Sequence, residues 1–133
     1  MRDAIQILRD SKTIAVVGLS RAARKAAHHV PASLQALGFR IIPVNPEADE
    51  ILGETVYRRL ADIPDPVDVV EVFRPAPEAA AVAREAAALG IGAIWLQLGI
   101  RSAEAAAIAA EAGMDYVEDR CMIVDARQAG IRH

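Results

Sequence analysis

The residues best suited to chemistry in this sequence follow its first strongly apolar run. The segment IAVV leads into Gly18, Leu19 and Ser20, and Arg24 and Lys25 come shortly afterwards. Glycine lets a backbone approach a ligand closely, and the start of a helix offers free N–H groups with a partial positive charge. Two cations beside such a helix start would add full charges to that field. The pattern therefore indicates that this loop binds an anion such as a phosphate.

The same loop departs from the fingerprint of dinucleotide-binding proteins. The pattern G-x-G-x-x-G would require glycine at two further positions, where the sequence has Ser20 and Ala23. The next apolar run ends in Asn45 and not in the Asp or Glu that commonly holds the ribose of NAD. An NAD(P)-binding redox or sensor domain stays open as an alternative. A plain strand–helix turn whose basic residues only face solvent stays open too.

Positive charge is concentrated in the first third of the chain. No acidic residue occurs between Asp10 and Glu47. The cations of this stretch are Lys12, Arg21, Arg24, Lys25 and Arg40. Because the net charge of the whole chain is −3, the remainder carries −8, and we expect an anionic ligand to meet the basic stretch. Nucleic acid is disfavoured, since the chain as a whole is acidic and only 4% of its residues are aromatic.

Length and composition restrict the class of protein. A chain of 133 residues, of which 53% are hydrophobic, fits a single domain, which we expect to span 1–133. No apolar stretch approaches the roughly 18–20 residues of a membrane helix, and the N-terminus lacks the apolar region of a secretory signal. The single cysteine, Cys121, excludes an internal disulfide and a cysteine-based zinc site. We therefore expect a soluble cytoplasmic protein that binds neither metal nor membrane.

Apolar runs rich in β-branched residues alternate with alanine-rich segments typical of helices. Strands are predicted at 13–17, 40–44, 55–57, 67–73, 93–98 and 115–117. Helices are predicted at 2–9, 28–37, 77–89 and 102–112, and 45–54 is expected to be a loop. Runs such as IAVV and VDVVEVF are almost continuously apolar, which suits parallel strands buried on both faces. The alternation predicts an α/β fold with a doubly wound parallel sheet.

Small and polar residues follow the carboxyl ends of several predicted strands. Asn45 and Pro46 follow the second strand, Arg74 follows the fourth, and Gly99 follows the fifth. In an open parallel sheet these ends share one edge, and ligands bind there. The sequence contains neither a G-x-S-x-G nucleophile elbow nor a Walker A motif, so we expect no catalytic centre.

Motifs along almost the whole chain, from about 14 to 124, resemble one known family. These motifs are VVGLS, RKAAHHV, GFRIIPVNP, ILGETVYRRLADIP, VDVVEVFR, IWLQLGI and DRCM. They resemble the small stand-alone CoA-binding proteins, which are similar to the N-terminal domain of the succinyl-CoA synthetase α subunit. The resemblance implies a Rossmann-like domain with strand order 3-2-1-4-5-6 that binds coenzyme A.

The resemblance also implies which residues contact the ligand. Carried over by position, they are Gly18, Leu19, Ser20, Arg24, Lys25, Asn45, Pro46, Phe73, Arg74, Leu98 and Gly99. One departure concerns the first loop, because this chain reads Lys25-Ala26-Ala27-His28 where relatives often carry R-P-S-[HY]. The loop therefore lacks the proline and the serine hydroxyl of those relatives.

The chemistry of coenzyme A agrees with the anion-binding loop and the basic stretch that the residues predict. Its pyrophosphate and 3′-phosphate suit an acid-free, cation-rich stretch, and its ribose lacks the free diol for which an acidic residue would be needed. The synthetase has a second domain that carries a phosphorylated histidine, and a chain of this length has no room for one. We therefore expect a non-catalytic protein that binds coenzyme A or acyl-CoA. A role as partner subunit of an acyl-CoA enzyme is a further alternative.

Overall fold

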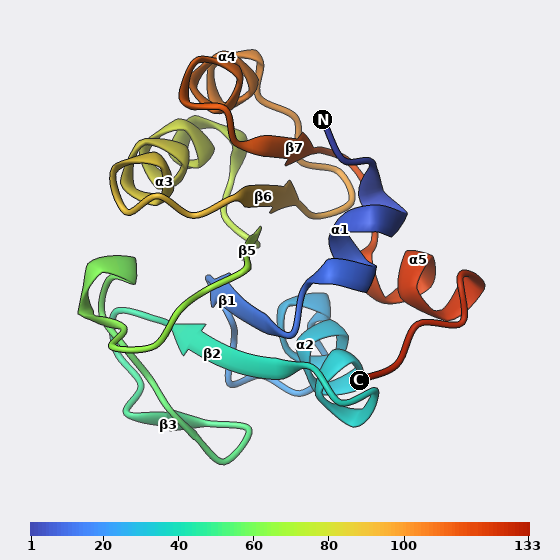
Figure 1. Cartoon of the computed structure of the whole chain (residues 1–133). Helices are drawn as coiled ribbons and strands as arrows, with labels where there is room; N and C mark the ends of the chain where they lie inside the picture. Colours follow the sequence, from blue (N-terminus) through green and yellow to red (C-terminus); the bar gives the residue numbers. More distant parts are fainter.

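The computed structural model describes all 133 residues and contains a five-stranded parallel sheet (Figure 1). Its strands are β1 (Thr13–Val17), β2 (Arg40–Val44), β5 (Val69–Val72), β6 (Ala93–Leu96) and β7 (Asp115–Val117). They lie in the order β2-β1-β5-β6-β7, and each neighbouring pair is parallel. The predicted α/β fold with a doubly wound, Rossmann-like sheet is confirmed.

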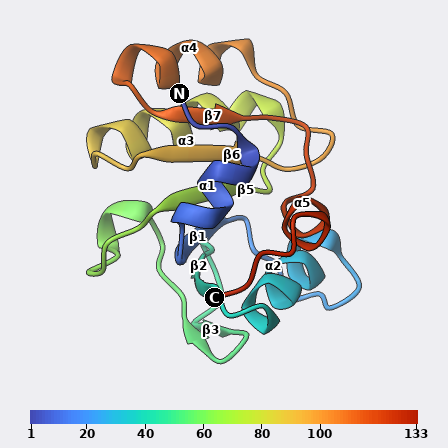
Figure 2. The ribbon, with the colours of Figure 1, turned by 45° about the vertical axis from the view of Figure 1, so that its right-hand side comes forward.

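Five helices cover the two faces of this sheet (Figures 1 and 2). They are α1 (Ala4–Asp10), α2 (Ala26–Ala36), α3 (Ala76–Ala88), α4 (Ala103–Ala112) and α5 (Met122–Gln128). Helices α3 and α4 pack together on one face, whereas α1, α2 and α5 lie on the other. None of the helices is both long enough and apolar enough to cross a lipid bilayer.

The central strands are apolar on both faces because helices cover both. In β1, Val16 belongs to the hydrophobic cluster beneath α1, α2 and α5, while Ala15 belongs to the cluster beneath α3 and α4. The same alternation holds in β5, where Val69 joins the first cluster and Val70 the second. This double burial explains why these strands read as continuous apolar runs in the sequence.

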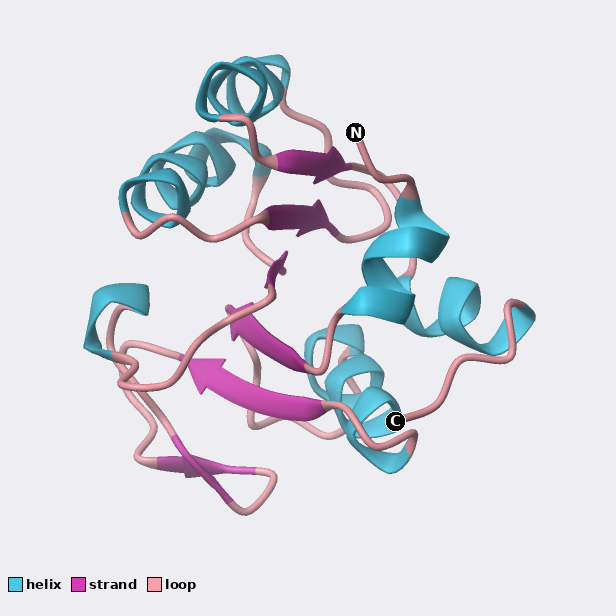
Figure 3. Ribbon diagram, in the orientation of Figure 1, coloured by secondary structure: helices cyan, strands magenta, loops and turns pink.

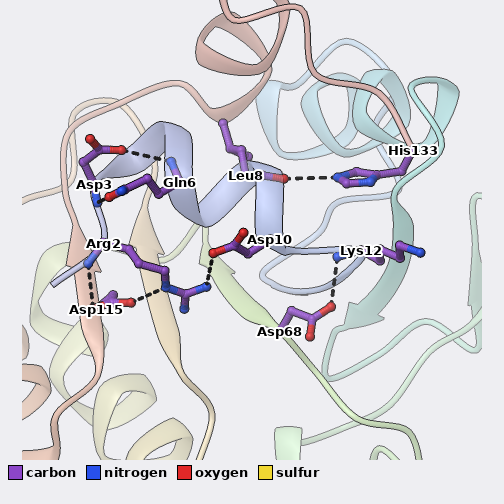
Figure 4. A network of polar contacts seen from close by, with 9 residues as sticks. All are labelled: Arg2, Asp3, Gln6, Leu8, Asp10, Lys12, Asp68, Asp115 and His133. Carbon is purple, nitrogen blue, oxygen red and sulfur yellow. Dashed lines mark hydrogen bonds and ion pairs between the residues drawn. The ribbon is translucent and has the colours of Figure 1, made fainter.

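Polar contacts fix α1 against the edge of the sheet where the strands begin (Figure 4). The guanidinium of Arg2 donates to the carboxylate of Asp115 in β7, with 2.6 Å between Nε and Oδ2. Near the other end of the helix, the carbonyl of Leu8 accepts a hydrogen bond from the ring of His133 (3.1 Å). Asp68, just before β5, accepts both backbone N–H groups at the entry to β1 (2.9 Å each). The N-terminal segment is thereby joined to the edge strand β7, and the C-terminal residue to α1.

Helix boundaries follow local capping signals. Ser102 caps α4, since its hydroxyl oxygen accepts the N–H of Ala105 (3.0 Å), and Gly113 ends that helix in the left-handed conformation (φ 70°). Serine and glycine are typical of these two positions. Helix α2 begins at Ala26, two residues earlier than predicted. Lys25 before it makes no side-chain capping bond, so the sequence carries no capping signal for this helix start.

The predicted strand at 55–57 is not a full member of the sheet, which corrects the expected order 3-2-1-4-5-6. Only Tyr57 reaches β2, through a single parallel bridge with Val44. The preceding residues form a hairpin in which β3 (Glu50–Ile51) pairs antiparallel with β4 (Glu54–Thr55), separate from the main sheet (Figure 3). Leu52 and Gly53 have φ values of 56° and 75°, as the two central residues of a tight hairpin turn require.

Helix α5 also corrects the sequence analysis, which predicts no helix after 117. The guanidinium of Arg120 donates to both carboxylate oxygens of Asp125 (2.6 and 2.9 Å). The carbonyl of Arg120 accepts the indole N–H of Trp95 (2.9 Å), and the side chain of Gln97 accepts the N–H of Met122 (3.3 Å). A helix of seven residues has little stability of its own, so these tertiary contacts define it.

One acidic residue interrupts the apolar interior. Glu71 lies in β5 in register with Val16 and Trp95, is fully buried, and neither of its carboxylate oxygens has a hydrogen-bond partner. Burial disfavours the charged form and raises the pKa of Glu71 from 4.5 to about 8. The folded protein therefore holds this carboxyl protonated at neutral pH.

We predict that the protein becomes less stable as the pH rises, because Glu71 binds its proton more tightly in the folded state than in the unfolded chain. This contribution to the free energy of unfolding is complete below about pH 4.5, where the unfolded chain is protonated too, and it is lost as the pH approaches 8. The expected slope is about 1.4 kcal/mol of unfolding free energy per pH unit. Urea denaturation between pH 5 and 8 measures it, and Glu71→Gln should remove the slope. Glu111→Gln on the exposed side of α4 is the control. Equal slopes in wild type and Glu71→Gln would contradict the assignment.

Candidate functional site

A cleft of about 750 Å³ opens at the carboxyl edge of β1, β2 and β5. It is lined by Val17, Gly18, Leu19, Ser20, Arg21, Ala22, Lys25, Ala27, Val44, Asn45, Pro46, Glu47, Arg58, Phe73, Arg74 and Glu78. The chain leaves β1 toward β2 on one side and returns to β5 on the other, so the loops after these strands diverge. Such a switch point is where open α/β sheets bind ligands.

Gly18 is required by the backbone next to it. Its φ is 90°, and a Cβ at this position would lie 2.9 Å from the carbonyl oxygen of Phe73 and 2.9 Å from Cδ of Arg74. Its N–H donates to the carbonyl of Val44 (3.0 Å), which fixes the loop at the end of β2. The glycine therefore lets β1 end tightly against the strands on both sides of it.

The first loop is held against α2 by two hydrogen bonds, one of which a proline makes possible. Pro31 lies inside α2 and has no N–H, so the carbonyl of Ala27 lacks its usual partner four residues on. That carbonyl instead accepts the N–H of Ser20 (2.9 Å). The carbonyl of Ser20 in turn accepts a hydrogen bond from Nδ1 of His28 (2.7 Å). The loop is thus fixed from two positions on the helix.

The start of α2 presents unpaired backbone donors to the cleft. Lys25 precedes the helix and provides no side-chain cap. The N–H groups of Ala26 and Ala27 have no acceptor within the protein, as expected in the first turn of a helix. Both Lys25 and Ala27 line the cleft. This end of the cleft therefore combines free N–H groups with the positive end of an eleven-residue helix.

The cations of the first loop have no carboxylate partners. None of the ion pairs in the protein includes Arg21, Arg24 or Lys25. By contrast, Arg74 forms a two-point contact with Glu78 on the β5 side of the cleft (2.8 Å from Nη2 to Oε1 and 3.1 Å to Oε2). The uncompensated positive charge of the cleft thus lies beside the first loop.

Asn45 joins the two loops that form the cleft. Its amide nitrogen donates to the carbonyl of Leu19 (2.9 Å), and its oxygen accepts the N–H groups of Glu47 and Ala48 (2.8 and 3.0 Å). These bonds occupy the amide oxygen and one amide hydrogen, so the residue acts mainly as a brace. The carboxylate of Glu47 also lines the cleft and has no ion-pair partner. Glu47 was not predicted as a site residue, because only the last residue of the strand was compared with the position of the NAD-binding acid.

The structure brings most of the expected contact residues together. Those that line the cleft are Gly18, Leu19, Ser20, Lys25, Asn45, Pro46, Phe73 and Arg74. The lining also includes charged residues that the sequence analysis did not single out as contacts, namely Arg21, Glu47, Arg58 and Glu78. Arg21 was recognisable from its place in the basic stretch, whereas Arg58 reaches the cleft from beyond the hairpin and carries no local signal.

Arg24, Leu98 and Gly99 do not line the cleft, and their contact with a ligand stays a prediction. Leu98 and Gly99 follow β6, which is separated from β1 by β5. The Leu98 side chain is exposed, and the N–H of Gly99 donates to the carboxylate of Asp119 (2.7 Å). That bond, together with the guanidinium of Arg101, holds the pKa of Asp119 below its usual value. Leu98 and Gly99 therefore belong to a separate turn, which is held by the carboxylate of Asp119.

The match to known families agrees with this geometry. Residues 12–127 match a family model described as a CoA binding domain. The chain belongs to this CoA-binding domain family. The resemblance noted in the sequence is thereby confirmed over most of the chain.

Relatives of the domain occur both as small proteins and as parts of large ones. An uncharacterised protein of Bacillus subtilis, YneT, is 39% identical over 119 residues, which cover 90% of this chain and 88% of YneT. An ADP-forming acetate–CoA ligase of Archaeoglobus fulgidus is 36% identical over 91% of this chain but only 17% of the ligase. The solved structure of a Thermus thermophilus protein is 39% identical, with a TM-score of 0.88 over 92% of this chain and 93% of that one.

We predict that Gly18→Ala destabilises the protein more than the same change at Gly90. Both glycines have positive φ (90° and 73°), but only at Gly18 would the added Cβ meet neighbouring atoms within 4 Å. The backbone conformation alone costs about 1 kcal/mol in either variant. Urea denaturation should therefore show a clearly larger loss for Gly18→Ala. Equal losses would mean that the close approach at β1 relaxes freely.

Proposed function

We propose that the cleft binds coenzyme A or an acyl-CoA, with phosphate groups at the first loop and at the start of α2. The observation that carries this proposal is the combination of unpaired N–H groups at Ala26 and Ala27 with the unpaired cations Arg21 and Lys25. Backbone donors and cations converging on one point are suited to a phosphate. Membership of the CoA-binding domain family supports coenzyme A as the source of that phosphate.

The dimensions and chemistry of the cleft also suit this ligand. Its volume of about 750 Å³ falls within the roughly 300–1,000 Å³ typical of sites for small molecules and cofactors. Phe73 and Val17 provide apolar surface on the β5 side, where the pantetheine arm would leave the phosphates. Pro46 and Arg58 border the cleft on the β2 side, where the nucleoside would lie.

We further propose that this chain binds its ligand without chemical turnover. The only hydroxyl side chain in the lining is that of Ser20, and its oxygen accepts the N–H of Ala22 (3.1 Å). The lining contains no histidine or cysteine that would serve as base or nucleophile. Because the match to the acetate–CoA ligase covers only 17% of that enzyme, the ligase reaction is not carried over to this chain.

One observation favours a second candidate, an NAD(P)-binding domain. The free carboxylate of Glu47 lines the cleft three residues beyond the end of β2, close to where an acidic residue holds the ribose of NAD in dinucleotide-binding folds. Asn45 at the end of the strand therefore does not by itself exclude NAD. A direct comparison of ligands separates the two candidates.

We predict that coenzyme A and acetyl-CoA raise the melting temperature, whereas NAD and NADP leave it unchanged. A ligand present at 100 times its Kd stabilises the folded state by about 2.7 kcal/mol. A thermal-shift titration with the four ligands measures the effect. A shift with NAD and none with coenzyme A would transfer the assignment to the redox or sensor alternative.

We also predict that Arg21→Ala and Lys25→Ala each weaken binding of coenzyme A by about tenfold to a hundredfold. Each removes a charge-assisted contact worth roughly 1.5–3 kcal/mol, at 1.4 kcal/mol per decade. Both variants should also reduce the salt dependence of binding. Arg40→Ala is the control, since Arg40 starts β2 at the far edge of the sheet and pairs with Asp65 (2.6 Å). Calorimetry at two salt concentrations measures all three variants. Wild-type affinity in both cleft variants would contradict phosphate binding at this loop.

A further inference from the structure

Arg58 is held in the cleft wall by three hydrogen bonds to the loop after β2. Its Nη1 donates to the backbone carbonyls of Asn45 (3.1 Å) and Ala48, and its Nη2 donates to the carboxylate of Asp49 (2.8 Å). All these acceptors belong to the loop after β2, whereas Arg58 follows the hairpin and the bridge at Tyr57. The guanidinium therefore spans a loop that is distant in sequence by about ten residues.

These contacts fix the plane of the guanidinium and engage three of its five in-plane N–H donors. N–H bonds of a guanidinium lie in its plane, so both hydrogens of Nη1 and one of Nη2 point into the loop and not into the cleft. Asp49 also offsets the charge. The Nε–H and the second Nη2–H take no part in these contacts. No aromatic ring of the protein stacks on the flat face of the guanidinium, and the side chain is 45% exposed and lines the cleft.

The flat face lies at the end of the cleft where the nucleoside is expected. The free N–H groups and cations place the phosphates at the first loop, in the middle of the cleft, and β2 and β5 lie on opposite sides of β1. Pro46, Glu47 and Arg58 line the β2 side. In folds with this switch point, the half that contains β1, its helix and β2 holds the adenosine. A guanidinium plane that is fixed in advance offers a stacking surface to a base with little loss of side-chain freedom.

We propose that Arg58 is a stacking platform for the adenine of the bound ligand, held flat by the loop after β2. The inference rests on the proposed binding of coenzyme A and assigns the base-binding end of that site. Arg58 thus contacts the base through its face, while Arg21 and Lys25 contact phosphates through their charge. Four arginine and lysine side chains line the cleft. Arg58 and Arg74 pair with carboxylates of the protein, whereas Arg21 and Lys25 have no such partner, and only Arg58 is bound to the loop after β2.

Calorimetry with three ligands tests this assignment on the whole chain. The ligands are coenzyme A, adenosine 3′,5′-bisphosphate, which is its nucleotide half, and 4′-phosphopantetheine, which lacks the adenosine. Stacking on a side chain predicts that Arg58→Ala weakens the two adenosine-containing ligands by about tenfold to a hundredfold and leaves 4′-phosphopantetheine unchanged. Arg58→Lys should be as weak as Arg58→Ala, because lysine keeps the charge but has no plane. The control is Arg59→Ala, the neighbouring arginine, which pairs with Asp62 outside the cleft.

A spectroscopic signature separates stacking from a purely structural effect on the loop. Adding adenosine 3′,5′-bisphosphate to the wild-type protein should move the Nε–H proton resonance of Arg58 upfield, because an adenine ring over the guanidinium shields it. Adding 4′-phosphopantetheine should not. No movement with the bisphosphate would overturn the platform, even if Arg58→Ala weakened binding, because Arg58 would then act only by holding the loop.

The outcomes also separate this inference from the proposed function. If coenzyme A binds the wild type and Arg58→Lys equally well, the platform is overturned while the CoA site stands. If neither coenzyme A nor the bisphosphate binds the wild type, the proposed function and the platform fail together. Losses confined to the adenosine-containing ligands, with the resonance shift present, support both.

Discussion

The position of β1 at the centre of the sheet determines where the cleft forms. β1 is hydrogen-bonded to β2 on one side and to β5 on the other, and both of its faces are covered by helices. Its only open direction is along its own axis, at the carboxyl end. There the chain must turn into α2 beside two neighbouring strand ends, and Gly18 makes this turn possible because a side chain would collide with the backbone after β5.

Backbone bonds then turn this crowded strand end into an ordered site. Pro31 leaves the carbonyl of Ala27 free to hold Ser20, and Asn45 ties the neighbouring loop to Leu19. With the loops fixed in this way, the unpaired N–H groups of α2 are organised before any ligand arrives. Preorganisation of this kind reduces the entropy lost on binding. The other cations of the cleft, Arg58 and Arg74, instead pair with carboxylates within the protein.

The sequence allowed the fold to be predicted where the signal is local. Buried parallel strands appear as unbroken apolar runs, and Ser102 and Gly113 mark the ends of α4 by their own chemistry. The outer strand at 55–57 could not be placed in this way, because the turn at Leu52 and Gly53 gives its neighbours a hairpin partner instead. Helix α5 was missed because contacts from Trp95 and Gln97, distant in sequence, define it.

The site shows the same division between local and long-range signals. The first loop was predictable from its glycine, its basic residues and the helix that follows. Arg58 was not predictable as a cleft residue, since its place depends on the hairpin that brings it against the loop after β2. Leu98 and Gly99 lie apart from the other predicted contact residues for a topological reason, because the strand that precedes them lies beyond β5 and they do not line the cleft.

The central claim is that phosphates of coenzyme A bind where the first loop meets α2. The most direct measurement is a titration of ¹⁵N-labelled protein with coenzyme A, followed by backbone amide resonances. The account predicts that the largest shifts occur at the amides of Ala26 and Ala27 and in the surrounding segment 18–27, because these N–H groups gain an acceptor. Shifts confined to the other end of the sheet, such as the smaller cavity of about 280 Å³ lined by Leu60, Val67 and Ile91, would contradict it.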